Sequence, residues 1–240
     1  MRKFTIASVM ALVVLCSCDD GSVIDKTYID EDETYSVVVT GRVTGMDTWA
    51  SGYNVVLGGF NEESDYSLIQ KSIAVNDGEM NVSLTGIPKS AKTIEIAAVT
   101  PLRIKIASVF SYDIPDGQRT DDVIRIDLGT LDASMYAAIQ KNIFENTSMN
   151  CSHCHRSATG AGKLTLVDGE SYAALVNVPS NHNGEQMRVV PGDADGSLLY
   201  QAMTSNMLPS KDHTGYFTDK ANVRLLNMLK AWIDGGAKNE

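Results

Sequence analysis

The residues with the clearest chemical potential form one short string, NCSHCH, at positions 150–155. Cys151 and Cys154 are separated by two residues, and His155 directly follows the second cysteine. This spacing serves covalent attachment of haem, and its parts also occur in zinc sites, in redox dithiols and in disulfides. The rest of the sequence must decide among these uses and chance.

Attachment of a c-type haem requires this order of residues for specific physical reasons. Two thiols must reach the two vinyl groups on one edge of the porphyrin, and the adjacent histidine must bind the iron from one face. The sequence therefore predicts one covalent haem c on Cys151 and Cys154, with His155 as the proximal iron ligand. A zinc site would need further ligands from His182, His213 or carboxylates. A thioredoxin-like dithiol would sit near a βαβ pattern, which is not evident here.

The far side of the iron has several candidate ligands. A haem that transfers electrons usually has a second strong axial ligand, and a thioether in that position raises the reduction potential. The candidate thioethers in the C-terminal half are Met187, Met203, Met207 and Met228. Among them, Met207 lies in SNMLPSKD, a loop from which a side chain can be presented across a pocket.

The N-terminus predicts export, which sets the redox environment of the cysteines. Arg2 and Lys3 precede an apolar run at residues 4–15, which is too short to span a bilayer and is typical of an export signal. An ordinary secretory signal and an uncleaved apolar anchor are both compatible with this run. Each of these N-terminal signals would take the chain out of the reducing cytoplasm, so a close pair of thiols should be oxidised or used by a cofactor.

The string LCSC at residues 15–18 resembles a bacterial lipobox. The resemblance implies a lipoprotein signal peptide at residues 1–17 and acylation of Cys18, so that Cys16 is lost with the signal. Acyl chains would then anchor the protein stably in a membrane of the bacterial cell envelope, facing the periplasm or the cell surface. Cys151 and Cys154 would be the only thiols left in the mature body, so no second cysteine pair completes a four-cysteine zinc site.

Charge limits the partners of the chain. The formal net charge is −10, and seven acidic residues against one lysine make residues 19–34 a solvated tether. We therefore predict an acidic tether at residues 18–34, no binding of nucleic acid, and membrane contact through the lipid on Cys18.

Residues 35–129 have the short period of β-strands and are predicted to form an all-β sandwich domain. Turn sequences separate the strands, and the half contains no histidine and no nucleophile arrangement. The segment VNDGEMNVSLTGIP resembles transthyretin-like and other immunoglobulin-like sandwiches. A spacer or protein-binding module is the expected role. The predicted strands are YSVVVTGRVT, YNVVLGGF, LIQKSIAV, EMNVSLT, KTIEIAAV, RIKIASVFSY and DVIRIDL.

The period changes to that of helices at Asp132. Apolar residues at three- and four-residue spacing predict a helix that runs almost to Cys151, and a second helix is predicted near the C-terminus. Thr218 and Asp219 are its expected cap, and its end falls at residues 235–236. Its expected apolar face is formed by Val223, Leu226, Leu229, Trp232 and Ile233.

The order of CSHCH, VVPGDADGSLLYQAM, NMLPSKD and LLNMLKAWIDGGA resembles the planctomycete-type group of monohaem cytochromes c. The resemblance implies a small all-α cytochrome c domain at residues 130–240 and a multidomain chain. It also implies Met207 as the distal iron ligand, and helix packing that involves Ile139, Phe144, Leu229 and Trp232. The family usually has proline directly after that methionine, whereas Leu208 intervenes here, so Met203 and a bis-histidine site with His213 stay open.

The predicted function is that of a lipid-anchored electron carrier, not an enzyme, because an iron with two axial ligands has no open position for a substrate. Its redox protein partner is not named by the sequence. A haem-based sensor with one open iron position is an alternative. Another alternative is a surface-binding lipoprotein in which the β-rich half carries the function.

Overall fold

The structure is a computed structural model that describes residues 34–74, 76–182, 184–208 and 211–239. The predicted signal peptide, the lipidation site Cys18 and the acidic tether up to residue 33 lie outside the described residues. Among the described residues, no helix is long and apolar enough to cross a membrane.

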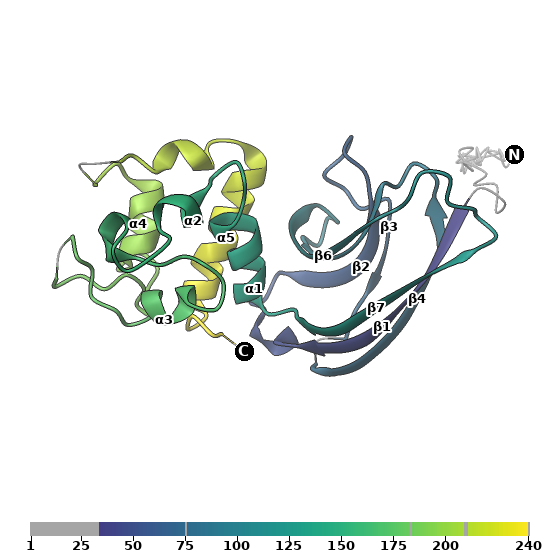
Figure 1. Ribbon diagram of the computed structural model, residues 1–240, viewed down its shortest axis with the longest axis horizontal. Coiled ribbons are helices and arrows are strands. Elements are labelled where there is room, and N and C mark those ends of the chain that lie inside the picture. Colours follow the sequence, from purple (N-terminus) through teal and green to yellow (C-terminus); the bar gives the residue numbers. More distant parts are fainter. Residues whose placement is uncertain (1–33, 75, 183, 209–210, 240) are drawn as a thin grey trace, which may run out of the picture.

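Seven strands form two sheets, which lie together on one side of Figure 1. In the first sheet β1 lies between β4, to which it is antiparallel, and β7, to which it is parallel. The second sheet has the order β3-β2-β5-β6 and is antiparallel throughout. Each of the seven segments predicted as strands overlaps one of them. Their bounds are β1 Thr34–Thr44, β2 Asn54–Phe60, β3 Ile69–Ser72, β4 Gly78–Pro88, β5 Thr93–Val99, β6 Lys105–Asp113 and β7 Val123–Asp132.

Alternation of apolar and polar residues explains which face of β1 is buried, whereas β2 and β5 are buried over nearly their whole length. On β1, Val37 and Val39 are buried while their neighbours are partly exposed. Leu57 of β2 and Ile94 and Ile96 of β5 belong to the same buried cluster. Because successive side chains of a strand point to opposite faces, one face of each sheet contributes to this shared core.

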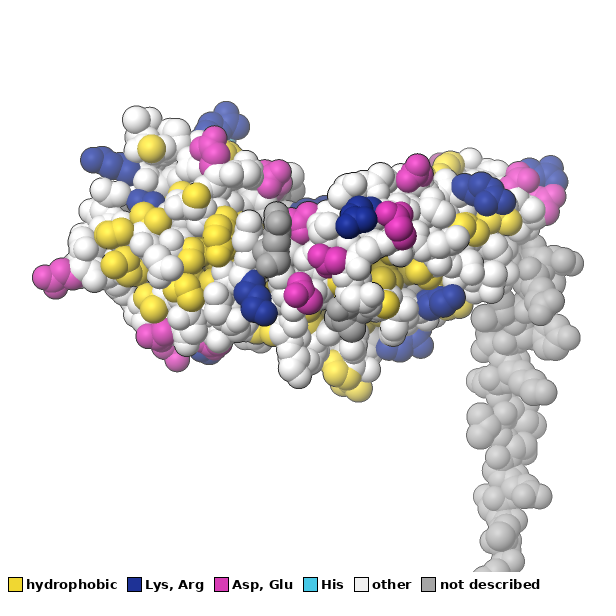
Figure 2. Space-filling model, turned by 90° about the horizontal axis from the view of Figure 1, so that it is seen from below, with side chains coloured by type: hydrophobic (Ala, Val, Ile, Leu, Met, Phe, Trp, Pro, Cys, Tyr) yellow, Lys and Arg dark blue, Asp and Glu magenta, His cyan; other side chains and the backbone are white. Residues whose placement is uncertain are grey.

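Short helices and loops follow the sheets and lie on the other side of Figure 1. In Figure 2 hydrophobic side chains are more frequent over this part of the visible face, whereas acidic and basic side chains mix over the β-rich part. The helical elements are η2 Met46–Thr48, α1 Met135–Ile139, the π-helical turn η3 Gln140–Phe144, α2 Cys151–Cys154, η4 Ala161–Lys163, α3 Ser171–Leu175, α4 Leu198–Thr204, η5 Thr214–Phe217 and α5 Lys220–Asp234.

The predicted fold class, an all-β sandwich followed by a small all-α cytochrome c domain, is wrong. Strand is the more abundant regular structure of the described residues, at 34% against 25% helix, and no small all-α domain is apparent among them. Of the α-helices described, only α5 exceeds seven residues. Isolated bridges such as those between Arg156 and Thr165 and between Val176 and Val189 join the loops instead. The physical reason is that glycine, asparagine and proline interrupt the helical periodicity between residues 145 and 197.

The helix expected to run almost to Cys151 stops earlier. The α-helical hydrogen-bond pattern of α1 gives way to a π-helical turn, η3, which ends at Phe144. The side chain of Asn142 contributes to this change, because its Nδ2 donates to the carbonyl of Ala138 at 2.8 Å and to that of Ser108 on β6 at 2.9 Å. The chain then turns at Asn146, whose Oδ1 accepts from the backbone N–H of Ser148 at 2.8 Å.

Contacts with β6 and its neighbours hold the helical elements against the sheets. Asn142 Oδ1 accepts from the backbone N–H of Ser108, and Lys141 Nζ donates to the carbonyl of Val109. Gly45, at φ +72°, lies so close to Ser134 that an added Cβ would stand 2.5 Å from the serine Cβ. The same buried cluster continues from the sheets through α1 to α5. The helical elements therefore have a fixed position relative to the sheets.

The C-terminal helix α5 begins and ends as predicted. Asp219 is its N-cap, with Oδ1 accepting from the N–H of Asn222 at 2.9 Å, and Gly235 follows its last residue. Its buried face contains Leu226, Leu229, Trp232 and Ile233, together with Leu225 and Met228. The prediction was wrong for Val223, which is 39% exposed. The expected packing partners Ile139 and Phe144 are fully buried in the same cluster.

Candidate functional site

The candidate site begins with α2, one helical turn formed by Cys151–Cys154. Asn150 precedes it with a positive φ of 53°, and the N–H of His155 donates to the carbonyl of Cys151 at 3.0 Å. The two cysteines and His155 therefore come from one compact turn. Both cysteines are free thiols; Cys151 is half-buried and Cys154 is exposed. Burial raises the pKa of the Cys151 thiol to about 11, so this thiol stays protonated at neutral pH.

His155 is held in one orientation by the loop that follows it. Its Nδ1 donates to the carbonyl of Ala161 at 2.8 Å, which leaves Nε2 as the nitrogen that can bind a metal. The pKa of His155 is lowered, first by burial and then by the nearby charges of His213 and Arg188. A neutral imidazole is the form that a metal requires. The histidine is thus both oriented and deprotonated for ligation at neutral pH.

Arg188 holds the turn that contains Ala161. It is 7% exposed, and its Nη2 donates to the carbonyls of Lys163 at 3.0 Å and Gly162 at 3.3 Å, while Nη1 donates to that of Ala174 at 2.7 Å. Both terminal nitrogens of Arg188 thus donate to main-chain carbonyls, and no pattern in the sequence indicated this role of the arginine.

His213 lies beside His155. The centres of the two imidazole rings are 6.2 Å apart, and their planes are inclined by 30°. The Nδ1 atom of His213 is buried, and it has no hydrogen-bond partner within the described part of the chain. The residue before it, Asp212, accepts hydrogen bonds from the N–H and the hydroxyl of Thr214, which fixes the turn at the start of η5. The structure therefore brings together two histidines that are far apart in the sequence.

The methionines considered as second ligands have different surroundings. Met207, the predicted distal ligand, is 38% exposed, and its N–H donates to the carbonyl of Ser205. Met203 is 7% exposed on α4 and belongs to the hydrophobic core, and Met228 is fully buried on α5. Met187 is half-buried.

A buried polar network connects η3 to the backbone of His155. Tyr136 donates to Ser171 Oγ at 2.6 Å, and Ser171 donates to Gln140 Oε1 at 2.6 Å. Gln140 Nε2 donates to the carbonyl of Leu166 at 3.0 Å, and the N–H of Leu166 donates to the carbonyl of His155 at 2.7 Å. Burial raises the pKa of Tyr136, so its hydroxyl remains a donor. The network was missed at the sequence level, because a glutamine in a helical stretch carries no sign of burial.

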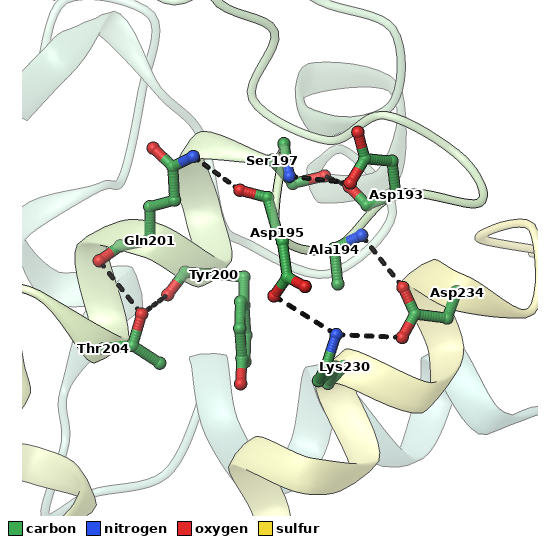
Figure 3. A network of polar contacts seen from close by, with 10 residues as sticks. Asp193, Ala194, Asp195, Ser197, Tyr200, Gln201, Thr204, Lys230 and Asp234 are labelled. Carbon is green, nitrogen blue, oxygen red and sulfur yellow. Dashed lines mark hydrogen bonds and ion pairs between the residues drawn. The ribbon is translucent and has the colours of Figure 1, made fainter.

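A second network, drawn in Figure 3, fastens the turn at residues 193–197 between α4 and α5. Lys230 of α5 contacts the carboxylates of Asp195 at 3.3 Å and Asp234 at 3.1 Å. Asp234 accepts from the N–H of Ala194 at 2.9 Å, and Gln201 of α4 donates to the carbonyl of Asp195 at 2.6 Å. The network therefore joins this turn to α4 and α5.

A zinc site formed by the protein alone was one alternative for this motif. In the ranges that the structure describes, no group of three or more His, Cys, Asp or Glu side chains is arranged to hold a metal ion. The motif turn with His155 and the neighbouring His213 is therefore the candidate site that we consider first among the described residues.

Comparison with known proteins adds no family to this description. No family model matches the chain, and neither a curated protein nor a solved structure matches it. The function must therefore be argued from the site itself.

Proposed function

We propose that this chain is a c-type haem protein that carries electrons in the cell envelope. Thioether bonds from Cys151 and Cys154 would hold one haem, and His155 would bind its iron. The observation that carries the proposal is the orientation of His155, whose Nδ1 donates to Ala161 directly after a turn with two free thiols. When bound, the haem would supply a reversible one-electron couple.

The residues of the site fit this cofactor. The protonated, half-buried thiol of Cys151 and the exposed thiol of Cys154 come from the same helical turn as the histidine. Ala161 accepts a hydrogen bond from the imidazole, Arg188 holds the turn that contains Ala161, and the Gln140 network holds the backbone of His155. Such support favours electron transfer, because a ligand that does not move adds little reorganisation. Met207 as the distal ligand stays a prediction from the sequence.

Anchoring to a membrane through Cys18 belongs to the same proposal. Residues 2–18 supply the charged start, the apolar run and the lipobox-like string. A lipid anchor followed by an acidic spacer would keep the haem near the membrane but outside the bilayer. A redox protein of the envelope is the expected partner, and its identity does not follow from the sequence.

The test is expression of the full chain in cells that attach c-type haem, followed by a haem stain on a denaturing gel. We expect one haem per chain in the wild type and loss of covalent haem in a Cys151→Ala, Cys154→Ala double variant. Ser152→Ala, in the same turn, is the matched control and should retain full haem content. A wild-type chain without covalent haem under these conditions contradicts the proposal.

A second candidate function, ligand binding by the β-rich part, rests on a separate observation. A hollow of about 650 Å³ is lined by residues of both charges, including Glu95, Asn61 and Asp65. Glu95 is 3% exposed; its Oε1 pairs with Lys105 at 2.9 Å, but its Oε2 has no partner within the described residues, nor has the buried Oδ1 of Asn61. Two unpaired acceptors favour a ligand with N–H donors. Calorimetric titration with small primary amines, with Glu95→Gln as the variant, tests it; no saturable binding by the wild type contradicts it.

A further inference from the structure

We propose that His213 is the second axial ligand of the iron, so that the site is a bis-histidine site. This inference rests on the proposed haem attachment at Cys151 and Cys154. It assigns a ligand at a position where the resemblance implies Met207. Two independent observations carry it: the separation of the two rings, and the unpaired nitrogen of His213.

The first observation is the distance between the imidazole rings. A histidine nitrogen lies about 2.0–2.1 Å from a bound metal and about 1.1 Å from the centre of its own ring. Two imidazoles on opposite sides of one metal therefore have ring centres about 6.2–6.4 Å apart. The rings of His155 and His213 are 6.2 Å apart. Their inclination of 30° is compatible with this arrangement, because each ring is free to rotate about its bond to the metal.

The second observation is the state of the His213 ring. Its Nδ1 is buried and has no hydrogen-bond partner in the described ranges. A buried polar atom without a partner is destabilising, so such an atom calls for a ligand or another compensating contact. Imidazole binds metals through either nitrogen, so Nδ1 of His213 can serve as a ligand. Because Nδ1 of His155 donates to Ala161, iron bound to His155 would be held by its other nitrogen, Nε2.

The surroundings of the methionines agree with this assignment. Met207 is 38% exposed at the surface, and Met203 is buried on α4 as part of the core. His213 is instead held at the start of η5, where Asp212 fixes the turn through two hydrogen bonds to Thr214.

The consequence for function is a lower reduction potential. A thioether favours ferrous iron and raises the potential, whereas a second imidazole lacks this effect. The carrier would therefore accept electrons from a more strongly reducing donor than a protein with histidine and methionine ligands. The chain would operate at the low-potential end of an electron-transfer sequence.

The experiment uses the full-length holoprotein in three forms: the wild type, His213→Ala and Met207→Leu. Covalent haem is measured on a denaturing gel, and ligation is measured by the absorption and electron paramagnetic resonance spectra of the ferric state. We expect His213→Ala to retain covalent haem, to lose the six-coordinate low-spin signal and to rise in potential. Added imidazole should restore the wild-type spectrum, which a merely structural role for His213 would not allow. Met207→Leu should match the wild type.

The wild type alone keeps the inference testable if His213→Ala fails to fold. A charge-transfer band of methionine sulfur on ferric iron in its spectrum overturns the assignment, as does a spectrum that changes in Met207→Leu but not in His213→Ala. Covalent haem with methionine ligation would leave the proposed function intact. A wild type without covalent haem would instead contradict the proposed function.

Discussion

Replacement of Gln140 by leucine tests whether the buried network supports the motif turn. Gln140 is 4% exposed and makes three hydrogen bonds: its Oε1 accepts from Ser171, and its Nε2 donates to Leu166 O at 3.0 Å and to Glu145 Oε1 at 2.9 Å. Leucine has nearly the same size but makes none of these bonds. Leu166 in turn donates its N–H to the carbonyl of His155. The substitution therefore removes a connection between η3 and the candidate iron ligand.

The expected loss of stability follows from the groups left without partners. The Ser171 hydroxyl and the Leu166 carbonyl lie in buried residues, whereas Glu145 is exposed and can turn to water. Each buried polar group that loses its partner costs about 1–3 kcal/mol, and burial of the apolar leucine offsets part of the total. We expect unfolding free energy to fall by about 2–4 kcal/mol, a decrease in Tm of about 5–15 °C for a chain of this size.

Urea unfolding followed by tryptophan fluorescence measures this effect, because Trp232 is buried on α5 and Trp49 packs beside α1 with its Nε1 donating to the carbonyl of Ala133. The matched control is Gln118→Leu, at a partly exposed turn where Nε2 donates only to the carbonyl of Arg119. That change should stay within about 0.5 kcal/mol. If Gln140→Leu lowers the unfolding free energy no more than Gln118→Leu does, the buried hydrogen-bond network does not stabilise the fold and the reasoning is refuted.

Three further predictions concern other contacts of the structure. Asp219→Ala removes the N-cap of α5 and should lower the unfolding free energy by about 1 kcal/mol in the same urea assay, whereas Asp116→Ala in an exposed turn should have little effect. Lys105→Met leaves the buried carboxylate of Glu95 without its cation and should lower the unfolding free energy by about 1–3 kcal/mol, which is less than for a fully buried pair because Lys105 is 32% exposed. Arg42→Met removes an ion pair with Glu79 that is exposed on both sides and should lower the unfolding free energy by less than about 1 kcal/mol. Equal losses of unfolding free energy in the two variants would contradict this ranking. In haem-free Cys154→Ser, the alkylation rate of Cys151 should still rise above about pH 9, where an ordinary thiol is already mostly ionised, because burial raises the pKa of Cys151 to about 11. Over the same pH range this thiol loses its proton in the unfolded chain before it does so in the folded chain, so the stability of the fold decreases as the pH rises. A rate that reaches a plateau near about pH 9 would contradict the burial of this thiol.

Several features of this protein follow from the sequence because they depend on neighbouring residues. Short segments rich in valine, isoleucine, threonine and tyrosine, several of them alternating with polar residues, locate the seven strands of the described residues, and Asp219 followed by an apolar periodicity locates the start of α5. The spacing of Cys151, Cys154 and His155 also places them in one turn, because only two residues intervene. In each case the relevant contacts lie within about one helical turn or one strand.

Other features depend on the path of the whole chain. The helical segment before the motif ends at Phe144, where the Asn142 side chain donates a hydrogen bond to the carbonyl of Ser108 on β6, a strand distant in the sequence. The part predicted to be an all-α domain consists of short helices and loops, apart from α5. Val223 is 39% exposed although it fits the apolar period of α5. Local periodicity cannot report which distant surface will cover a side chain.

The candidate site shows the same division. The sequence by itself determined that a two-cysteine turn with an adjacent histidine exists, and hence which cofactor chemistry to consider. Only the tertiary structure decided that Ala161 orients His155 and that Arg188 holds the turn that contains Ala161. The tertiary structure also decided that the ring centres of His213 and His155 lie 6.2 Å apart. The contacts of Arg188 and His213 join residues that are far apart in the sequence, so they form only when the whole chain folds.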